Sequence, residues 1–220
     1  MAAAEFHRAG LCGLVEFYRP SCPGPEVAPR EAIWASHKAV VRRALERNLQ
    51  TALIFEDDVT FRIADPASRI ARAVTKLPEG WNGLFLGHWP ISGWFTGWGV
   101  MEVNSGLAHA WLANRPLLDL LDSHEVCDPR LRYMAVFGKG IDSALGSLDR
   151  MFALFPMIAL QRETESDNLS ATHTRSGHPR RWNDKLRYRI WVIQRLPRYA
   201  EWVCLLLSPF HWLRARFRKQ

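Results

Sequence analysis

The sequence has few cysteines and, in its most apolar C-terminal part, no run long enough for a membrane span. Its four cysteines lie far apart, with no Cys-x-x-Cys pair and no Cys/His spacing suited to zinc, which predicts reduced thiols. The longest charge-free run near the C-terminus covers residues 202–213, whereas a spanning helix needs about twenty residues. No opening segment pairs a basic stretch with an apolar core and a cleavage site. We therefore expect a cytoplasmic protein.

The net positive charge of the chain is confined to its C-terminal end. Residues 175–220 hold twelve Lys or Arg against two acidic residues, a net charge of +10, so residues 1–174 carry −3 of the formal +7. A mildly acidic body argues against a nucleic-acid partner. Because the tail mixes tryptophan and leucine with arginine, we expect a helical element lying on an anionic membrane surface, at the inner face of the plasma membrane. The alternative is a helix pair that packs on the body.

The composition predicts one globular domain, residues 1–174, followed by the tail 175–220. Apolar residues make up 48% of the chain, which is enough for one sizeable core. Residues 30–49 place apolar side chains at helical spacing between charged ones, which predicts an amphipathic helix of roughly four to five turns. The apolar run 52–55 is typical of a strand buried on both faces, as in a parallel sheet.

Helices and short apolar strands continue to alternate along the chain. The pattern predicts helices over 65–77 and 115–124, each with a proline near its start, and strands over 82–87, 105–114 and 151–160. This alternation is typical of an α/β sandwich, for which we expect a mostly parallel central sheet. In such sheets ligands bind outside the carboxyl ends of the strands.

Three consecutive carboxylates, Glu56, Asp57 and Asp58, follow the apolar run 52–55 and form an acidic triplet. Like charges on neighbouring residues repel one another, most strongly where water is scarce. If the strand continues, Glu56 and Asp58 point to one side and Asp57 to the other. Two carboxylates on one side suit a hard divalent cation with open positions for phosphate oxygens. The alternative is a solvated acidic turn.

Two histidines fall within apolar patterns. His37 lies on the apolar stripe of the first predicted helix, next to Ser36. A lone histidine at such a position is more often a hydrogen-bonded core residue than a functional one, and both interpretations stay open here. His109 lies in an otherwise apolar predicted strand, and we expect it to be structural.

The segment "WASHKAVVRRALERNLQTALIFEDDVTF" resembles the signature of glycosyltransferase family 25, the lipooligosaccharide and procollagen galactosyltransferase group. That family pairs a Ser-His helix with a strand ending in Glu-Asp-Asp. Later blocks follow in the family's order: "WNGLFLG", "NSGLAHAWLANRPLLDLL", "GIDSAL" and "FPMIALQRETESD". The resemblance covers about residues 30–168, and the first block is the most specific.

The resemblance implies a GT-A-like nucleotide-sugar-binding sandwich. It makes Glu56 and Asp58 the ligands of an Mn²⁺ or Mg²⁺ ion that bridges the donor's diphosphate. It also implies a set of donor-binding residues: Ser36, His37, Asp57, Gln161 and Ser166, with Asp167 beside the last. The chain has no counterpart of the family's first apolar strand before Phe6, so the expected sheet lacks its first strand.

The family is understood to invert the anomeric centre while transferring galactose or glucose. Such a direct displacement needs a base for the acceptor hydroxyl proton. The resemblance places this base on Asp142, which matches the family's downstream Asp. The alternative is that Asp142 caps the N-terminus of a helix.

A tryptophan-rich segment, residues 87–100, is the expected acceptor site. Indole faces of Trp89, Trp94 and Trp98 suit the apolar face of a sugar ring, and the surrounding glycines would let a loop close over substrate. The alternative is a surface flap that buries its own aromatic rings.

The resemblance therefore implies an inverting, metal-dependent hexosyltransferase. The expected donor is a UDP-hexose, and the expected acceptor is a lipopolysaccharide or another cell-surface glycan, free or lipid-linked. The alternative is a catalytically degenerate member that binds a glycan or a partner protein at the membrane, because the nucleotide-holding first strand has no counterpart.

Overall fold

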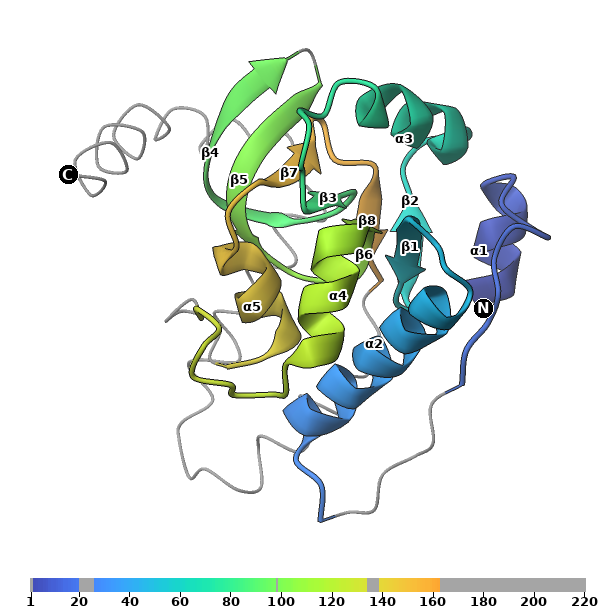
Figure 1. Ribbon diagram of the computed structural model, residues 1–220. Coiled ribbons are helices and arrows are strands. Elements are labelled where there is room, and N and C mark those ends of the chain that lie inside the picture. The colour runs from blue at the N-terminus through green and yellow to red at the C-terminus, as the bar shows by residue number, and fades with distance from the viewer. Residues whose placement is uncertain (1, 20–25, 98, 134–138, 163–220) are drawn as a thin grey trace, which may run out of the picture.

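The computed structural model of the protein describes residues 2–19, 26–97, 99–133 and 139–162, and Figure 1 shows their arrangement. Five helices and eight strands form one α/β unit with a six-stranded sheet and a two-stranded sheet. The α/β class predicted from the sequence is thereby confirmed. Ser166, Asp167, Trp98 and the basic tail lie outside the described residues, so the predictions made for them stay predictions.

The six-stranded sheet has the order β1-β6-β3-β7-β5-β4. Only β3 and β7 pair in parallel, and the other four pairings are antiparallel. The expectation of a mostly parallel sheet was therefore wrong for the strands described here. Apolar runs reveal burial but not direction, and a tight β4–β5 hairpin can join only antiparallel strands. The strands are β1 Thr51–Phe55, β3 Gly83–Phe85, β4 Trp89–Gly97, β5 Val100–Gly106, β6 Ala110–Asn114 and β7 Met151–Leu154.

Each face of the sheet is covered by its own layer. One face packs on α2 (Pro29–Glu46), α4 (Arg115–Ser123) and α5 (Ile141–Ser147), with Trp111 and Phe85 at the centre of that core. The opposite face packs on α1 (Ala2–Arg8), α3 (Pro66–Val74) and the small sheet of β2 (Val59–Phe61) and β8 (Ala159–Gln161). Alternate residues of a strand serve the two cores, as the period of two requires. Figure 1 shows α2 and α4 side by side in front of the sheet.

The strand β1 confirms one prediction and corrects another. Ala52 and Ile54 belong to the core under α2, whereas Leu53 and Phe55 pack against the opposite core, so both faces of the strand are covered. However, β1 is an edge strand of the six-stranded sheet, and its partner β6 is antiparallel.

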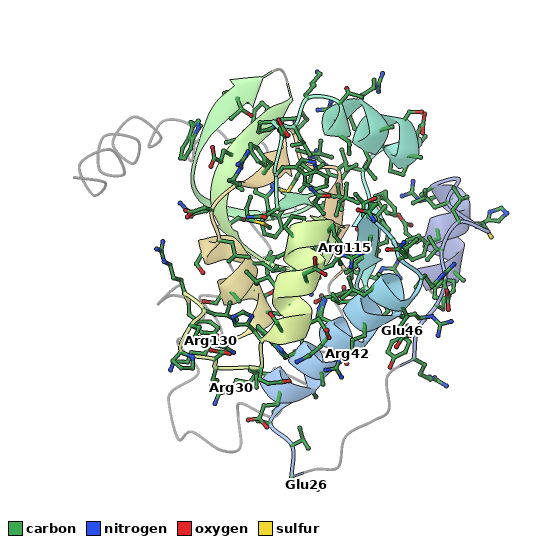
Figure 2. All side chains as sticks on the ribbon, viewed as in Figure 1. Glu26, Arg30, Arg42, Glu46, Arg115 and Arg130 are labelled. Carbon is green, nitrogen blue, oxygen red and sulfur yellow. The ribbon has the colours of Figure 1, made fainter. Side chains whose placement is uncertain are left out.

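Local signals located three helices within a few residues. The helices α2, α3 and α4 fill most of the predicted ranges, and each carries a proline in its first turn. Asp65 caps α3 by accepting a hydrogen bond from the Ser68 amide. On the outer side of α2, the half-exposed Arg42 pairs with Asp122 of α4, and Figure 2 labels Arg30, Arg42 and Glu46 along this helix.

Two predicted elements differ from the observed ones. The predicted strand 151–160 is divided into β7 and β8, which lie in different sheets, because the segment 155–158 between them turns at Pro156. Proline has no amide hydrogen to donate to a ladder, so the first strand stops there. Most of the segment 87–100 is a strand and not a loop, since residues 89–97 form β4 and β5 begins at Val100.

No helix in the described ranges has both the length and the apolar character that crossing a bilayer requires.

Candidate functional site

The acidic triplet forms a turn between β1 and β2. The Glu56 amide donates to the His109 carbonyl at 2.8 Å, and the Val59 amide donates back to the Glu56 carbonyl at 3.3 Å. The predicted extended continuation of the strand was therefore wrong. The predicted division of the side chains is nevertheless observed, because Glu56 and Asp58 are partly buried and Asp57 is exposed.

His37 reaches the triplet from α2. Its Nε2 lies 3.6 Å from Glu56 Oε1, and its ring is tilted against Trp111 with the ring centroids 6.0 Å apart. The side chain is buried, as the core interpretation requires, and it also touches the acidic triplet. Burial alone would raise the pKa of Glu56, but the hydrogen bond and charge of His37, with the charge of His109, lower it. Glu56 is therefore ionised at neutral pH.

Gln161 brings β8 to the same place. Its Nε2 donates to Glu56 Oε2 at 3.3 Å, and the Arg162 amide donates to the Asp58 carbonyl at 2.8 Å. Burial, followed by the charges of Glu56 and Asp57, raises the pKa of Asp58 to about 6, against a smaller opposite effect of Gln161. Oδ1 of Asp58 is buried and has no hydrogen-bond partner among the described residues. An acceptor of this kind needs a proton or a cation.

Asp142 lies in the first turn of α5 and accepts a hydrogen bond from the Ala108 amide at 2.8 Å. The capping interpretation was wrong, because the residue at the N-cap is Gly140 and Asp142 bonds outside its helix. Burial and the charge of Glu56 raise the pKa of Asp142 to about 6, partly offset by His37. We call Glu56, Asp58 and Asp142 the acidic corner.

The segment 107–109 connects the two sides of the acidic corner. Its Ala108 amide bonds the Asp142 side chain, and its His109 carbonyl bonds the Glu56 amide. Leu107 adopts a left-handed φ of 69°, an unfavourable conformation for a leucine. This backbone conformation lets the chain turn between β5 and β6 while the segment keeps its hydrogen bonds to Asp142 and Glu56.

Two buried histidines lie between strands, His88 between β3 and β4 and His109 between β5 and β6. Both His88 and His109 are almost fully buried. Burial lowers the pKa of His109, although the charge of Glu56 acts in the opposite direction. Burial and the neighbouring His109 lower the pKa of His88 to about 3, so this ring is neutral at physiological pH. Sequence reasoning missed His88, although a histidine at the end of the apolar run 83–86 was a usable signal.

The acidic corner suits a hard divalent cation. Carboxylate oxygens are the ligands that Mg²⁺ and Mn²⁺ prefer. The buried Oδ1 of Asp58, which has no hydrogen-bond partner among the described residues, is available as a metal ligand next to Glu56. Among the described residues, no group of three or more His, Cys, Asp or Glu side chains is arranged as a metal site. Glu56 and Asp58 would therefore hold the ion with the help of oxygens from substrate or water, as is usual for Mg²⁺.

The remaining predicted site residues within the described ranges lie on α2 and β4. Ser36 uses its hydroxyl within α2, where it donates to the Ala32 carbonyl at 2.8 Å. Trp89 opens β4 opposite Gly106, two residues before the Ala108 amide that bonds Asp142. Trp94 lies farther along β4, opposite Glu102, and is half-buried. Of the two predicted acceptor tryptophans within the described residues, Trp89 pairs at the end of β5 that leads to Ala108.

No protein-family model and no curated protein matches this chain. Among solved structures, the crystal structure of A197 from STIV is similar, with a TM-score of 0.45 and 16% sequence identity. The alignment covers 74% of this chain and 80% of that chain.

Proposed function

We propose that the protein is an inverting, metal-dependent hexosyltransferase with a GT-A-like fold that lacks the first strand. The observation that carries the proposal is the convergence of five residues from four places in the fold: Glu56 and Asp58 from the β1–β2 turn, Asp142 from α5, His37 from α2 and Gln161 from β8. These are residues that the family resemblance marks for metal, donor and base. The expected donor is a UDP-hexose, and the expected acceptor is a cell-surface glycan such as lipopolysaccharide.

In this proposal Glu56 and Asp58 hold Mn²⁺ or Mg²⁺. When bound, the ion neutralises the charge that develops on the departing nucleoside diphosphate. His37 keeps Glu56 ionised and oriented, since their side chains lie 3.6 Å apart and both are largely withdrawn from water. Gln161 orients the other oxygen of Glu56 through its amide hydrogen bond. This arrangement supplies a preorganised anionic site at the end of β1.

Asp142 is the proposed general base. A pKa of about 6 suits a carboxylate that must be ionised at neutral pH and still accept a proton. The Ala108 amide fixes Oδ1, so Oδ2 is the oxygen that would take the proton of the acceptor hydroxyl. In an inverting displacement the base acts on the face of the sugar opposite the leaving group, so the donor sugar would lie between Asp142 and the ion held by Glu56 and Asp58.

The proposal is tested by donor hydrolysis and transfer. Purified protein is incubated with Mn²⁺, common UDP-hexoses and glycan acceptors, and the release of nucleoside diphosphate is measured. We expect release that depends on Mn²⁺ and falls on the order of 10²-fold or more in Asp58→Asn. No release with any donor, or unchanged release in Asp58→Asn, would refute the transferase.

A degenerate, non-catalytic relative is the second candidate, because the family's nucleotide-holding first strand has no counterpart in the sequence. In the sheet formed by the described residues, β1 is an edge strand. Calorimetry with UDP separates the two functions. The transferase binds UDP in a manner that depends on Mn²⁺, whereas the degenerate protein does not. The proposed peripheral membrane location rests on the composition of residues 175–220 and is tested by sedimentation with anionic vesicles.

A further inference from the structure

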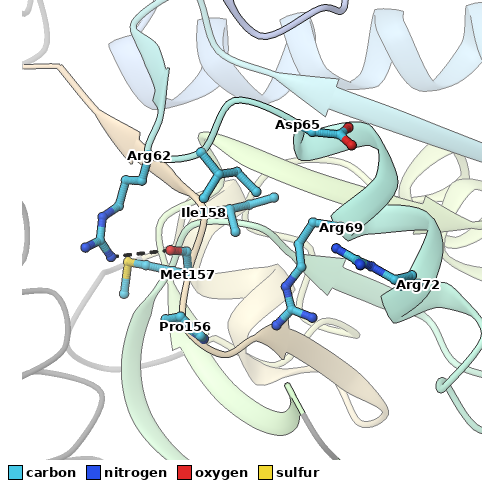
Figure 3. A pocket seen from close by; sticks show the side chains of 8 residues that line it. Arg62, Asp65, Arg69, Arg72, Pro156, Met157 and Ile158 are labelled. Carbon is cyan, nitrogen blue, oxygen red and sulfur yellow. Dashed lines mark hydrogen bonds between the residues drawn. The ribbon is translucent and has the colours of Figure 1, made fainter.

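A second polar site lies away from the acidic corner, in a pocket of about 440 Å³ between α3 and the segment before β8. We call it the arginine pocket. Three arginines line it, Arg62 just after β2 and Arg69 and Arg72 on α3, and Figure 3 labels them with other lining residues. Met157 and Ile158, both buried, contribute apolar surface to the lining. Its volume lies within the range of small-ligand sites.

Two of the arginines are held in place by backbone carbonyls. Arg69 donates through one terminal nitrogen to the Phe155 carbonyl at 2.8 Å, and the Gly99 carbonyl lies 3.4 Å from the same nitrogen. Arg62 donates to the Met157 carbonyl at 3.5 Å, as the dashed line in Figure 3 indicates. These bonds leave other N–H groups of each guanidinium for a ligand. Carbonyl anchoring orients the cations without neutralising them.

The charge of the pocket is positive. Its lining contains one acidic residue, Asp65, and that carboxylate already accepts the Ser68 amide as the cap of α3. Three guanidinium groups and one carboxylate leave a formal charge of +2. Arg69 is also half-buried beside Arg72, and burial and this like charge lower the pKa of Arg69. Two neighbouring cations of this kind are stabilised by a bound anion.

We propose that the arginine pocket binds the phosphate monoester of a phosphorylated sugar. A phosphate monoester carries a charge close to −2 at neutral pH, which matches the formal +2 of the lining. Guanidinium groups bind phosphate through paired N–H donors. The pocket is larger than a phosphate ion, and the lining residues Ile63 and Pro156, which are at least partly exposed, offer apolar surface that suits the C–H face of a sugar ring.

The pocket and the acidic corner lie at opposite ends of the two-stranded sheet β2·β8. At one end the Arg162 amide bonds the Asp58 carbonyl, and at the other the Arg62 amide bonds the Ile158 carbonyl. Asp58 and Arg62 are four positions apart along the extended chain of β2, or about 13 Å. If the transferase of the previous subsection is correct, a phosphate on the acceptor could be held at this distance from the transfer site. Phosphate binding by itself does not depend on that function.

The test is calorimetric titration of the full chain with glucose 6-phosphate, with glucose, inorganic phosphate and glucuronate as comparison ligands. We expect binding of glucose 6-phosphate, weaker binding of inorganic phosphate because the sugar contacts are lost, and none of glucose. Binding should weaken as salt is raised. Equal binding of glucose and glucose 6-phosphate, or preferential binding of glucuronate, would overturn the proposal.

The variants Arg72→Gln and Arg69→Gln should each weaken binding of glucose 6-phosphate by about tenfold or more, since each removes a charge-assisted hydrogen bond. The matched control is Arg30→Gln, which removes one exposed arginine at the start of α2 and should change binding less than twofold. Arg62 and Arg72 are both exposed, so Arg62→Gln and Arg72→Gln test the pocket even where Arg69→Gln fails to fold. Unchanged binding in these two variants would refute the site. Release of nucleoside diphosphate in the assay above distinguishes failure of this site from failure of the transferase.

Discussion

The acidic corner and the arginine pocket hold like charges together in two different ways. In the corner, burial and mutual repulsion raise the pKa of Asp58 and of Asp142 to about 6, while His37 supports the charge of Glu56. In the pocket, Arg62 and Arg72 remain exposed. Backbone carbonyls position the guanidinium groups of Arg62 and Arg69.

The difference is one of solvation. Buried carboxylates reduce their repulsion by taking up protons or binding a cation, whereas exposed arginines stay charged and keep free donors. The corner should therefore respond strongly to pH and to the loss of one partner. The pocket should respond chiefly to salt and to anions.

The largest effect on stability is expected for His37→Ala. The change removes a buried ring that packs on Trp111 and leaves Glu56 without its ion-pair partner. We expect the free energy of unfolding to fall by about 2 to 3 kcal/mol at pH 7. Urea denaturation measures the loss, and His7→Ala on the exposed side of α1 is the control. A loss equal to that of the control would mean that the Glu56 contact contributes little.

Asp142→Asn should stabilise the protein at neutral pH. The pKa of Asp142 is raised from 3.8 to about 6 in the folded state, so its contribution to stability is full below pH 4 and is lost as pH rises through 6. Asparagine keeps an oxygen for the Ala108 amide and has no charge to bury. We expect the variant to gain about 1 to 3 kcal/mol over wild type between pH 4 and 7.

Thermal unfolding at a series of pH values measures this difference. The comparison with wild type at each pH removes the part of the Glu56 contribution that does not depend on the charge of Asp142; the lowered pKa of Glu56 acts with the opposite sign, so that its stabilisation is lost as pH falls. A stability difference between the variant and wild type that is independent of pH would contradict a raised pKa of the buried Asp142 carboxyl.

Gly99→Ala should displace Arg69, one of the three arginines that line the arginine pocket. Gly99 has a φ of +80°, and a Cβ there would lie 2.5 Å from a terminal nitrogen of Arg69. We expect a loss of about 1 kcal/mol in unfolding free energy from the backbone conformation alone. Binding of glucose 6-phosphate should weaken as Arg69 is displaced. Gly10→Ala, which has a similar φ of +69° and open space around its Cβ, is the matched control for strain without displacement.

The smallest effect is expected for Asp57→Asn. Asp57 is exposed, and its charge contributes only a minor part of the raised pKa of Asp58. Stability should change by less than about 0.5 kcal/mol. The pKa of Asp58, followed by carboxyl NMR titration, should fall slightly. A large loss of stability would show that Asp57 has a buried role that its exposure does not indicate.

The sequence by itself determined three of the described helices and the position of the acidic triplet. Amphipathic spacing and early prolines were sufficient for α2, α3 and α4, because these signals act within one or two turns. The run of apolar residues before Glu56 was sufficient to predict a strand with both faces covered. The association of Glu56 with Asp58, and of both with Gln161 and Asp142, followed from the family resemblance.

Only the tertiary structure decided the directions of the strands and the partners of the site residues. Strand direction depends on neighbours far away in the chain, and hydrophobic periodicity is the same for parallel and antiparallel strands. Asp142 bonds Ala108 instead of capping its helix because α5 packs against β5. The pocket arginines meet Met157 and Ile158 because β8 pairs with β2, a contact across about a hundred residues that no local pattern in the sequence reveals.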